Sequence, residues 1–475
     1  MAIKKRVTVN KVSTIFPSLT KLPCVYSLSN FDLVNATIPT YMQVVYYFNA
    51  GTDANNVALL MESLREALIE TLEIFPVLGG RLRNADGGRL EVLLNIGGGI
   101  PFYEATAAAR LEEWPDLRDC SLETELNPEN VMIGDFKCAP LARAQATVFK
   151  CGGVALGFSA SHAVSDGKGA TEFMKAWGEI YMRGNVSLQP YLDRSLLFAR
   201  DPPIVTIPIP RHIASMQIPG ESMDPFPSET DGTRSKIFCF QEHNINELMH
   251  EIEQGPYKYG RATSFETLSA LLWLSVTKAR KQEINCDTRY TFPVSARGGR
   301  WQPLLPEGYF GNAVINSSAV ARSGELVSQH ISYAARMIHD SVRLVDAEFL
   351  RSMVDWLELE LLEGRLVGEP NPFNGRDLIT TSLVNFPTYD LNFGWGRPLH
   401  FSFSLPSGSS GDGLVYILSA PQGGRSRHVA VSLREEHMTR LLEDEFFVQF
   451  LSELKTSDRH LKANATMHKH QANGA

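Results

Sequence analysis

The sequence predicts a mixed α/β protein that is divided into two domains. Strand patterns and helical patterns alternate in both halves of the chain, which is typical of sheets covered by helices. The length of 475 residues is sufficient for two or three ordinary domains. A proline-rich stretch without sustained periodicity separates the halves. We therefore expect a first domain over residues 1–200, a crossover linker over 201–234, a second domain over 235–457 and a disordered polar tail over 458–475.

In the first half, alternating and β-branched segments predict strands, and leucines about one turn apart predict a helix. Pro76 and Gly79-Gly80 end that helix, and two short apolar runs after them predict a hairpin. The expected elements are strands at 6–14 and 42–48, a helix at 55–73, a hairpin at 81–83 and 90–93, and strands at 140–150 and 152–160.

The second half repeats this coarse order of strands and helices without a repeat in the sequence itself. A helix is expected to begin at Ser264 as N-cap, with Thr267 at the third helical position. The other expected elements are strands at 235–240, 288–295, 312–320, 378–386 and 414–420, and helices at 324–342, 346–362 and 434–455.

One short stretch, Ser161 to Gly167, joins an expected buried strand to a strongly helical pattern. This places His162 on a strand-to-helix turn, where a rigid scaffold can aim a side chain. A histidine there can accept a proton near neutral pH, because its unperturbed pKa is about 6.5. Asp166, four residues later, can hold the loop or orient the ring. A His-x-x-x-Asp pattern alone is a weak signal, so the interpretation depends on other stretches.

Composition narrows the classes of function. A net charge of −8 and the lack of a basic stripe argue against a nucleic-acid partner. Six cysteines lie far apart without a Cys-x-x-Cys pair, so we expect no metal site. The basic N-terminus is not followed by the apolar core of a signal peptide, and the longest apolar stretch, 265–276, is too short to span a bilayer. We expect a cytoplasmic monomer with free thiols and no membrane association.

Three further stretches join the histidine motif in a fixed order. They are Leu28-Ser29-Asn30-Phe31-Asp32, Tyr309-Phe310-Gly311-Asn312 and Asn392-Phe393-Gly394-Trp395-Gly396, the last roughly 230 residues after His162. Together they resemble the Leu-Ser-x-x-Asp, Tyr-Phe-Gly-Asn and Asp-Phe-Gly-Trp-Gly motifs of the BAHD acyltransferases, acyl-CoA-dependent enzymes of plant specialised metabolism. The resemblance covers about residues 6–455 and is greatest to the hydroxycinnamoyltransferase-like branch.

The resemblance implies two chloramphenicol-acetyltransferase-like domains, each a mixed sheet with helices, and an active-site channel between them. Acyl-CoA is the expected co-substrate, the acceptor is a small alcohol or amine, and no bound cofactor is expected. His162 is the expected general base, which takes the acceptor's proton and returns it to the departing sulfur. Thr381 or Ser382 are the candidates for stabilising the oxyanion.

Other motif residues are expected to support the site rather than to react. The resemblance implies that Asp166 pairs with an arginine, for which Arg297 is the match and Arg300 a rival. It also implies that Gly394, Trp395 and Gly396 shape the channel for CoA, away from the chemistry. Asn392 stands where the family has aspartate, and because a neutral amide can keep the hydrogen bonds, we expect no loss of activity.

The acceptor is left open by the sequence. Shikimate- and quinate-using relatives carry a tryptophan and an arginine where this chain has Leu383 and Asn385. Asparagine cannot replace a bidentate carboxylate partner at equal strength. Tyr41, Met42 and Gln43 are expected to face the acceptor and are apolar or neutral. With no cation identified there, we expect neutral alcohols or amines to outcompete shikimate and quinate.

Several alternatives remain. An acetyl- or aliphatic-acyl-CoA alcohol acyltransferase would share the fold, and a non-catalytic ligand-binding relative should have lost His162. Condensation-domain-like enzymes and carnitine-type transferases share the His-x-x-x-Asp chemistry. The condensation-domain-like enzymes usually show two adjacent histidines, whereas position 161 here is serine. A serine hydrolase would need a Gly-x-Ser-x-Gly elbow, whereas the segment 157–161 ends in Ser161.

Overall fold

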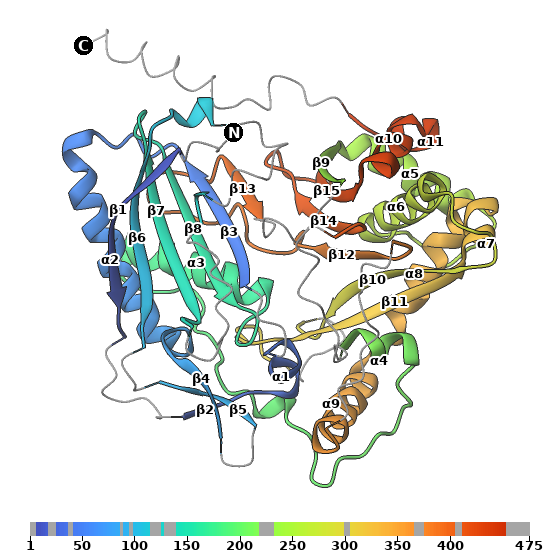
Figure 1. The fold of residues 1–475 in the computed structure, drawn as a ribbon, viewed down its shortest axis with the longest axis horizontal. Coiled ribbons are helices and arrows are strands. Elements are labelled where there is room, and N and C mark those ends of the chain that lie inside the picture. The colour runs from blue at the N-terminus through green and yellow to red at the C-terminus, as the bar shows by residue number, and fades with distance from the viewer. Residues whose placement is uncertain are drawn as a thin grey trace.

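The protein folds around two six-stranded sheets that lie beside each other, each partly covered by helices (Figure 1). This computed structural model describes residues 6–17, 25–36, 41–85, 89–94, 98–114, 125–127, 139–217, 232–298, 305–364, 375–403 and 411–452. Both sheets contain parallel and antiparallel pairs, so the predicted mixed α/β class is confirmed. The expected disordered tail, 458–475, lies outside the described residues.

The first sheet carries the histidine turn. Its strands, in spatial order, are β1 (Val7–Ile15), β6 (Ile100–Ala107), β7 (Ala142–Phe149), β8 (Val154–Ser161), β3 (Tyr41–Phe48) and β13 (His400–Phe403). Strands β7 and β8 are buried along their whole length. This explains the apolar run of β8 up to Phe158, whereas β7 alternates the polar residues Arg143, Gln145 and Thr147 with apolar ones. Helices α2 (Val57–Ile74) and α3 (Gly167–Arg183) pack against each other and share this sheet's hydrophobic core.

Strand β13 comes from the second half of the chain, although it belongs to the first sheet. It pairs antiparallel with β3, with Phe401 opposite Tyr46 and their ring centroids 4.9 Å apart. The first sheet is therefore completed by residues that lie beyond the linker. The division into domains at 201–234 stays a prediction.

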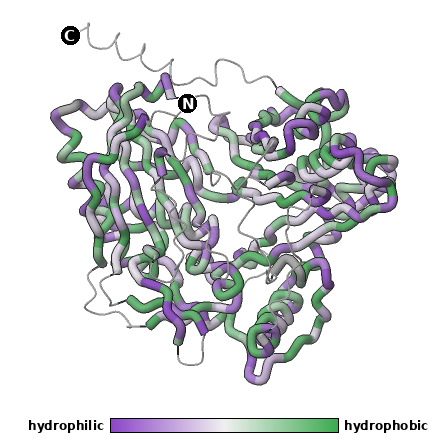
Figure 2. The backbone as a smooth tube through the Cα atoms, viewed as in Figure 1, coloured by the Kyte–Doolittle hydropathy of each residue, from purple (hydrophilic) through white to green (hydrophobic). Residues whose placement is uncertain are grey.

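The second sheet contains, in spatial order, β11 (Val314–Arg322), β10 (Asp287–Ser295), β12 (Leu378–Ser382), β14 (Leu414–Ser419), β15 (Arg427–Arg434) and β9 (Thr233–Phe240). Helix α6 (Ser264–Arg280) is buried on nearly all sides, which accounts for its apolar sequence. It is flanked by α5 (Glu242–Gln254), α8 (Ile331–Leu344) and α10 (Glu435–Glu443). Hydrophobic residues run through the strands of both sheets in Figure 2.

A small sheet and helix α1 lie together at one end of the molecule (Figure 1). A three-stranded sheet contains β2 (Val25–Ser27), β5 (Leu90–Leu93) and β4 (Arg81–Asn84), the last two forming the expected hairpin pair. Helix α1 (Asn30–Ala36) contacts α9 (Ala347–Leu362). The remaining helices are α4 (Arg211–Gln217), α7 (Ser323–Ser328) and α11 (Glu445–Val448). Because α4 lies within 201–234, the expected linker is not irregular throughout.

Several predicted boundaries were wrong for local reasons. Helix α6 is capped by Thr263, which forms a capping box with Glu266, so Ser264 is its first residue rather than its cap. The helix expected over 324–342 is two helices, because the extended backbone of His330 caps the start of α8. Strand β12 ends at Ser382, and the 434–455 helix ends early as α10 and α11.

Candidate active site

His162 lies directly after β8, in a tight turn that leads into α3. Asp166 is the N-cap of α3, and its Oδ1 accepts a hydrogen bond from the Gly169 amide at 3.0 Å. A Cβ at Gly169 would collide with Ser165 Oγ, and one at Gly167 would lie 2.9 Å from Phe386 Cε2. The glycines after the histidine therefore let the turn pack closely against its surroundings.

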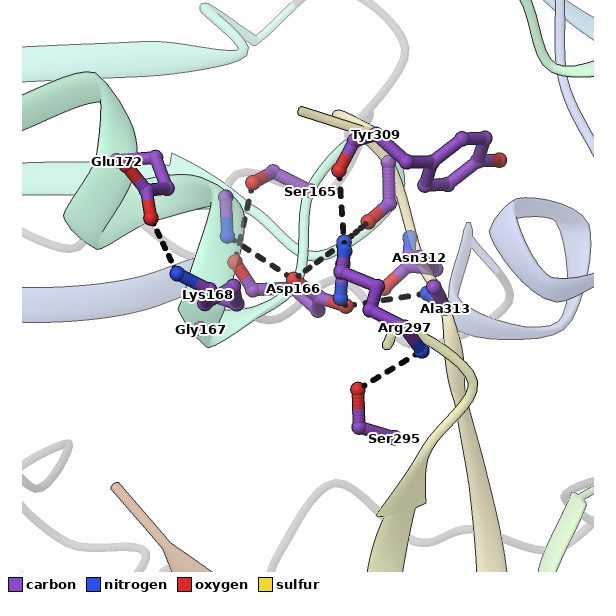
Figure 3. A network of polar contacts seen from close by, with 12 residues as sticks. Ser165, Asp166, Gly167, Lys168, Glu172, Ser295, Arg297, Tyr309, Asn312 and Ala313 are labelled. Carbon is purple, nitrogen blue, oxygen red and sulfur yellow. Dashed lines mark hydrogen bonds and ion pairs between the residues drawn. The ribbon is translucent and has the colours of Figure 1, made fainter. Parts of the chain in front are cut away.

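Asp166 forms a bidentate ion pair with Arg297, which follows β10 in the second sheet (Figure 3). Arg297 Nη1 lies 2.6 Å from Asp166 Oδ2 and Nη2 lies 3.1 Å from Oδ1, and the Asp166 and Arg297 side chains are 3% and 7% exposed. The Ala313 amide also donates to Asp166, at 3.1 Å. Burial alone would raise the pKa of Asp166, but Arg297 and these donors hold it below its ordinary value. Arg300, the rival, lies outside the described residues.

A second polar contact reaches His162 from the same side. Asn312, which precedes β11, places Oδ1 3.0 Å from His162 Nδ1 and donates from Nδ2 to the His162 carbonyl at 2.7 Å. The same Nδ2 donates to Asp32 Oδ1 at 2.8 Å. Among the described residues, His162 Nε2 has no hydrogen-bond partner.

Asp32 is held by a buried arginine that the sequence analysis did not single out. Arg194 Nε lies 2.5 Å from Asp32 Oδ2, and the two side chains are 1% and 0% exposed. Arg194 also donates to the Val164 carbonyl at 2.6 Å and lies over the Tyr26 ring. No local pattern marks Arg194 in the sequence, because its partners Asp32 and Val164 are distant along the chain.

The protonation of His162 follows from its surroundings. Burial lowers the pKa of the half-buried His162 below its usual value, and the Asp166 charge and the Asn312 hydrogen bond only partly oppose this effect. The imidazole is therefore neutral near pH 7. A neutral imidazole with one nitrogen free can accept a proton.

The candidate residues of the segment 381–385 fall into two environments. Thr381 and Ser382 are partly buried at the end of β12, whereas Leu383 is 1% exposed and Asn385 is exposed in a turn. A Cβ on Gly167 would lie 3.5 Å from Leu383 Cδ2, so the end of β12 approaches the histidine turn. Leu383 and Asn385 are both expected to face the acceptor, but the first is buried and the second is exposed.

The neighbourhood of Tyr41 contradicts one expectation, that no cation lies there. The Arg143 guanidinium lies 4.4 Å from the centroid of the Tyr41 ring, and Arg143 is 3% exposed. Tyr41 donates to the Pro140 carbonyl, and Gln43 is buried opposite Ser159. Arg143 carries no motif in the sequence, because it is one of three polar residues, with Gln145 and Thr147, that alternate with apolar ones along β7.

The 392–396 stretch lies away from His162. Asn392 is exposed and its Oδ1 accepts from the Gly394 amide at 2.8 Å, while Gly394 and Gly396 have φ of +85° and +83°. Phe393 stacks on Trp395 and meets Trp177 and Phe48 edge-on. Phe48 pairs with Val154 at the start of β8, about 23 Å of strand from Ser161.

Three properties of the described residues concern metal binding, membrane spanning and surface pockets. No group of three or more His, Cys, Asp or Glu among them could hold a metal ion. None of their helices is both long enough and apolar enough to cross a membrane. A surface pocket of about 420 Å³ lies beside α9, and its lining includes Arg89, Arg200 and Glu358 but not His162.

Known proteins resemble this chain over most of its length. Residues 5–447 match the Transferase family. A hydroxycinnamoyltransferase of Narcissus pseudonarcissus is 31% identical over 87% of this chain and 93% of its own length. A shikimate O-hydroxycinnamoyltransferase of Nicotiana tabacum is 32% identical over 86% and 92%.

Solved structures share the fold at lower identity. The crystal structure of vinorine synthase superposes with a TM-score of 0.71 at 21% identity, covering 94% of this chain and 98% of that one. The TRI101 protein of F. graminearum, solved with coenzyme A and deoxynivalenol, gives 0.72 at 15% identity, covering 90% and 99%.

Proposed function

Because the chain belongs to the Transferase family of BAHD acyltransferases, we propose that it transfers a hydroxycinnamoyl group from coenzyme A to a hydroxyl or amine of a small specialised metabolite. The observation that carries the mechanism is the position of the His162 ring, with Nδ1 bonded to Asn312 and Nε2 without a partner among the described residues. The hydroxycinnamoyl donor is supported by the names of relatives that are 31% and 32% identical.

In this mechanism His162 acts twice. Its Nε2 takes the proton of the acceptor's oxygen or nitrogen as that atom attacks the thioester carbonyl. The tetrahedral intermediate then collapses, the carbon–sulfur bond breaks, and the imidazolium returns the proton to the departing thiolate. No covalent acyl-enzyme is needed, so holding both substrates beside one imidazole supplies much of the remaining acceleration.

The oxyanion of that intermediate requires hydrogen-bond donors. The hydroxyls of Thr381 and Ser382 are the candidates, because the end of β12 approaches the histidine turn through Leu383 and Gly167. Asp166 is unsuited to this task because it is anionic and already bound to Arg297.

For the acceptor, we propose a neutral alcohol or amine. The support is that Asn385 is exposed and neutral where carboxylate-binding relatives carry arginine. A carboxylate-bearing acceptor is the second candidate, because Arg143 supplies a buried cation against Tyr41 and a relative from tobacco is named for shikimate. The two candidates differ in whether Arg143 matters to the acceptor.

A mass-spectrometric screen tests both parts of the proposal. Purified enzyme is incubated with hydroxycinnamoyl-, acetyl- and long-chain acyl-CoAs against pooled neutral alcohols, amines, shikimate and quinate, with His162→Ala as the blank. We expect hydroxycinnamoyl esters or amides of neutral acceptors. A highest kcat/KM for shikimate, lost in Arg143→Met, would establish the second candidate instead. Products formed only from acetyl- or long-chain acyl-CoA would overturn the donor.

A further inference from the structure

The side chain of Asn312 lies among three polar groups whose chemistry fixes its orientation. Asp32 Oδ1 is 2.8 Å from Nδ2, the His162 carbonyl oxygen is 2.7 Å from Nδ2, and His162 Nδ1 is 3.0 Å from Oδ1. A backbone carbonyl can only accept, and the Asp32 carboxylate also receives donors from Arg194, Ser29 and the Asn312 amide. Both hydrogens of the Asn312 NH₂ group are therefore used, and the oxygen must face the histidine ring.

An amide oxygen can only accept a hydrogen bond, so the ring nitrogen that faces it must carry the proton. In a neutral imidazole a proton on Nδ1 leaves the lone pair on Nε2. We propose that Asn312 is a positioning residue that holds His162 in its Nδ1–H tautomer, which makes Nε2 the atom that receives the acceptor's proton. This inference rests on the proposed function of His162 and identifies what keeps that base in its reactive form.

Asp32 and Arg194 prevent the Asn312 amide from reversing. Asp32 Oδ1 accepts from both the Asn312 backbone amide, at 3.0 Å, and its side chain. A reversed amide would place Asn312 Oδ1 against the Asp32 carboxylate oxygen and the His162 carbonyl oxygen, neither of which has a hydrogen to donate, so the buried Oδ1 would lose its hydrogen-bond partner at a cost in free energy. Because Arg194 fixes the other oxygen of Asp32, the carboxylate cannot turn away. The tautomer is thus determined by three residues that are distant in the sequence: Asp32 in α1, Arg194, and Asn312 just before β11.

A neutral partner also suits a base that must release its proton. A carboxylate bonded to Nδ1 would favour the imidazolium by a full charge, whereas an amide oxygen contributes only a dipole. The nearest charges, Asp166 and Asp32, are each bound to an arginine. His162 can therefore take the acceptor's proton and return it to the thiolate without becoming permanently charged.

Asn30 provides a matched control for a test by substitution. Asn30 and Asn312 are both fully buried, and Asn30 donates to the Val354 carbonyl at 2.9 Å and accepts from Arg89. We expect Asn30→Ala and Asn312→Ala both to lower Tm. Only Asn312→Ala should lower kcat, by about 10- to 100-fold, with little change in KM. This loss is smaller than that of His162→Ala, because in Asn312→Ala the imidazole is still present and still samples the reactive tautomer.

The tautomer itself is read by ¹⁵N NMR of histidine-labelled enzyme, with the His162 signals assigned by their absence in His162→Gln. We expect a protonated Nδ1 and an unprotonated Nε2 in the wild type and in Asn30→Ala, and mixed tautomers in Asn312→Ala. A proton on Nε2 in the wild type would overturn the inference, even if Asn312→Ala did not fold.

The outcome separates this inference from the function on which it rests. Full turnover in His162→Ala would remove the general base and with it the proposed mechanism. An inactive His162→Ala together with an Asn312→Ala that turns over like Asn30→Ala would overturn only the role of Asn312.

Discussion

The histidine turn, 161–167, and the aromatic turn, 392–396, are two of the glycine-containing stretches that the sequence motifs single out, and they are held in place differently. In the histidine turn, Asp166 and His162 bond to Arg297 and Asn312, which lie more than a hundred residues away. In the aromatic turn, Asn392 bonds only two residues ahead, and the long-range contacts are made by Phe393 and Trp395. The first turn is held by buried charge and the second by ring packing, so polar substitutions should matter in one and apolar substitutions in the other.

The largest contrast should come from His162→Ala. Loss of a general base typically costs 10²–10⁴-fold, and we expect kcat to fall by about that factor while the fold is kept. Circular dichroism and acyl-transfer assays on the purified variant provide the measurement. Wild-type-like turnover would remove the distinction between the two turns.

The second contrast concerns the buried ion pair of the histidine turn. Removal of one partner leaves the other charge unpaired, so we expect Asp166→Ala and Arg297→Ala each to lose about 3–5 kcal/mol of unfolding free energy. The loss in the double variant should be smaller than the sum of the two. Denaturant unfolding of the three variants measures this coupling, and strictly additive losses would show that the two side chains act independently.

In the aromatic turn the comparable residue is Phe393. It is fully buried against Trp177, Phe48 and Trp395, so we expect Phe393→Ala to cost about 3–5 kcal/mol of stability. Because these contacts lie far from Ser161 along β8, folded enzyme should keep its turnover number. A stable variant with greatly reduced kcat would place this turn in the chemistry.

The pH dependence of kcat/KM should also distinguish the two turns, although this effect is smaller. Burial lowers the pKa of His162, so protonation removes the base only below its ordinary value of about 6.5. The acid limb of kcat/KM should therefore lie below pH 6.5 and remain there in Asn392→Ala, whose side chain does not contact His162. The measurement is a pH–rate profile of both enzymes; an acid limb above pH 6.5 would contradict the direction of the shift.

The smallest effect is expected for Asn392 itself. The side chain is exposed and makes one local hydrogen bond, so Asn392→Ala should cost no more than about 1 kcal/mol and leave turnover unchanged. Thermal unfolding compared with Phe393→Ala provides the check. A loss as large as that of Phe393→Ala would mean that the polar residue, rather than the rings, holds the turn.

The sequence by itself determined the fold class and the position of His162, because both depend on local signals. Period-two and period-3.6 patterns reflect burial of one face at a time, and a strand followed by Asp166 and glycines specifies a turn and a helix start. Boundaries that depend on a cap one residue away, such as Thr263 of α6, were less certain because several residues can serve as cap.

The tertiary structure alone decided which distant groups surround that histidine. Arg194 and Arg143 carry no motif, and Asn312 reaches His162 only because β11 and β8 belong to sheets that meet. Strand β13 likewise joins the first sheet from the second half of the chain. Burial makes partners for these polar groups obligatory, but the choice of partner depends on how the two sheets pack, which no local pattern encodes.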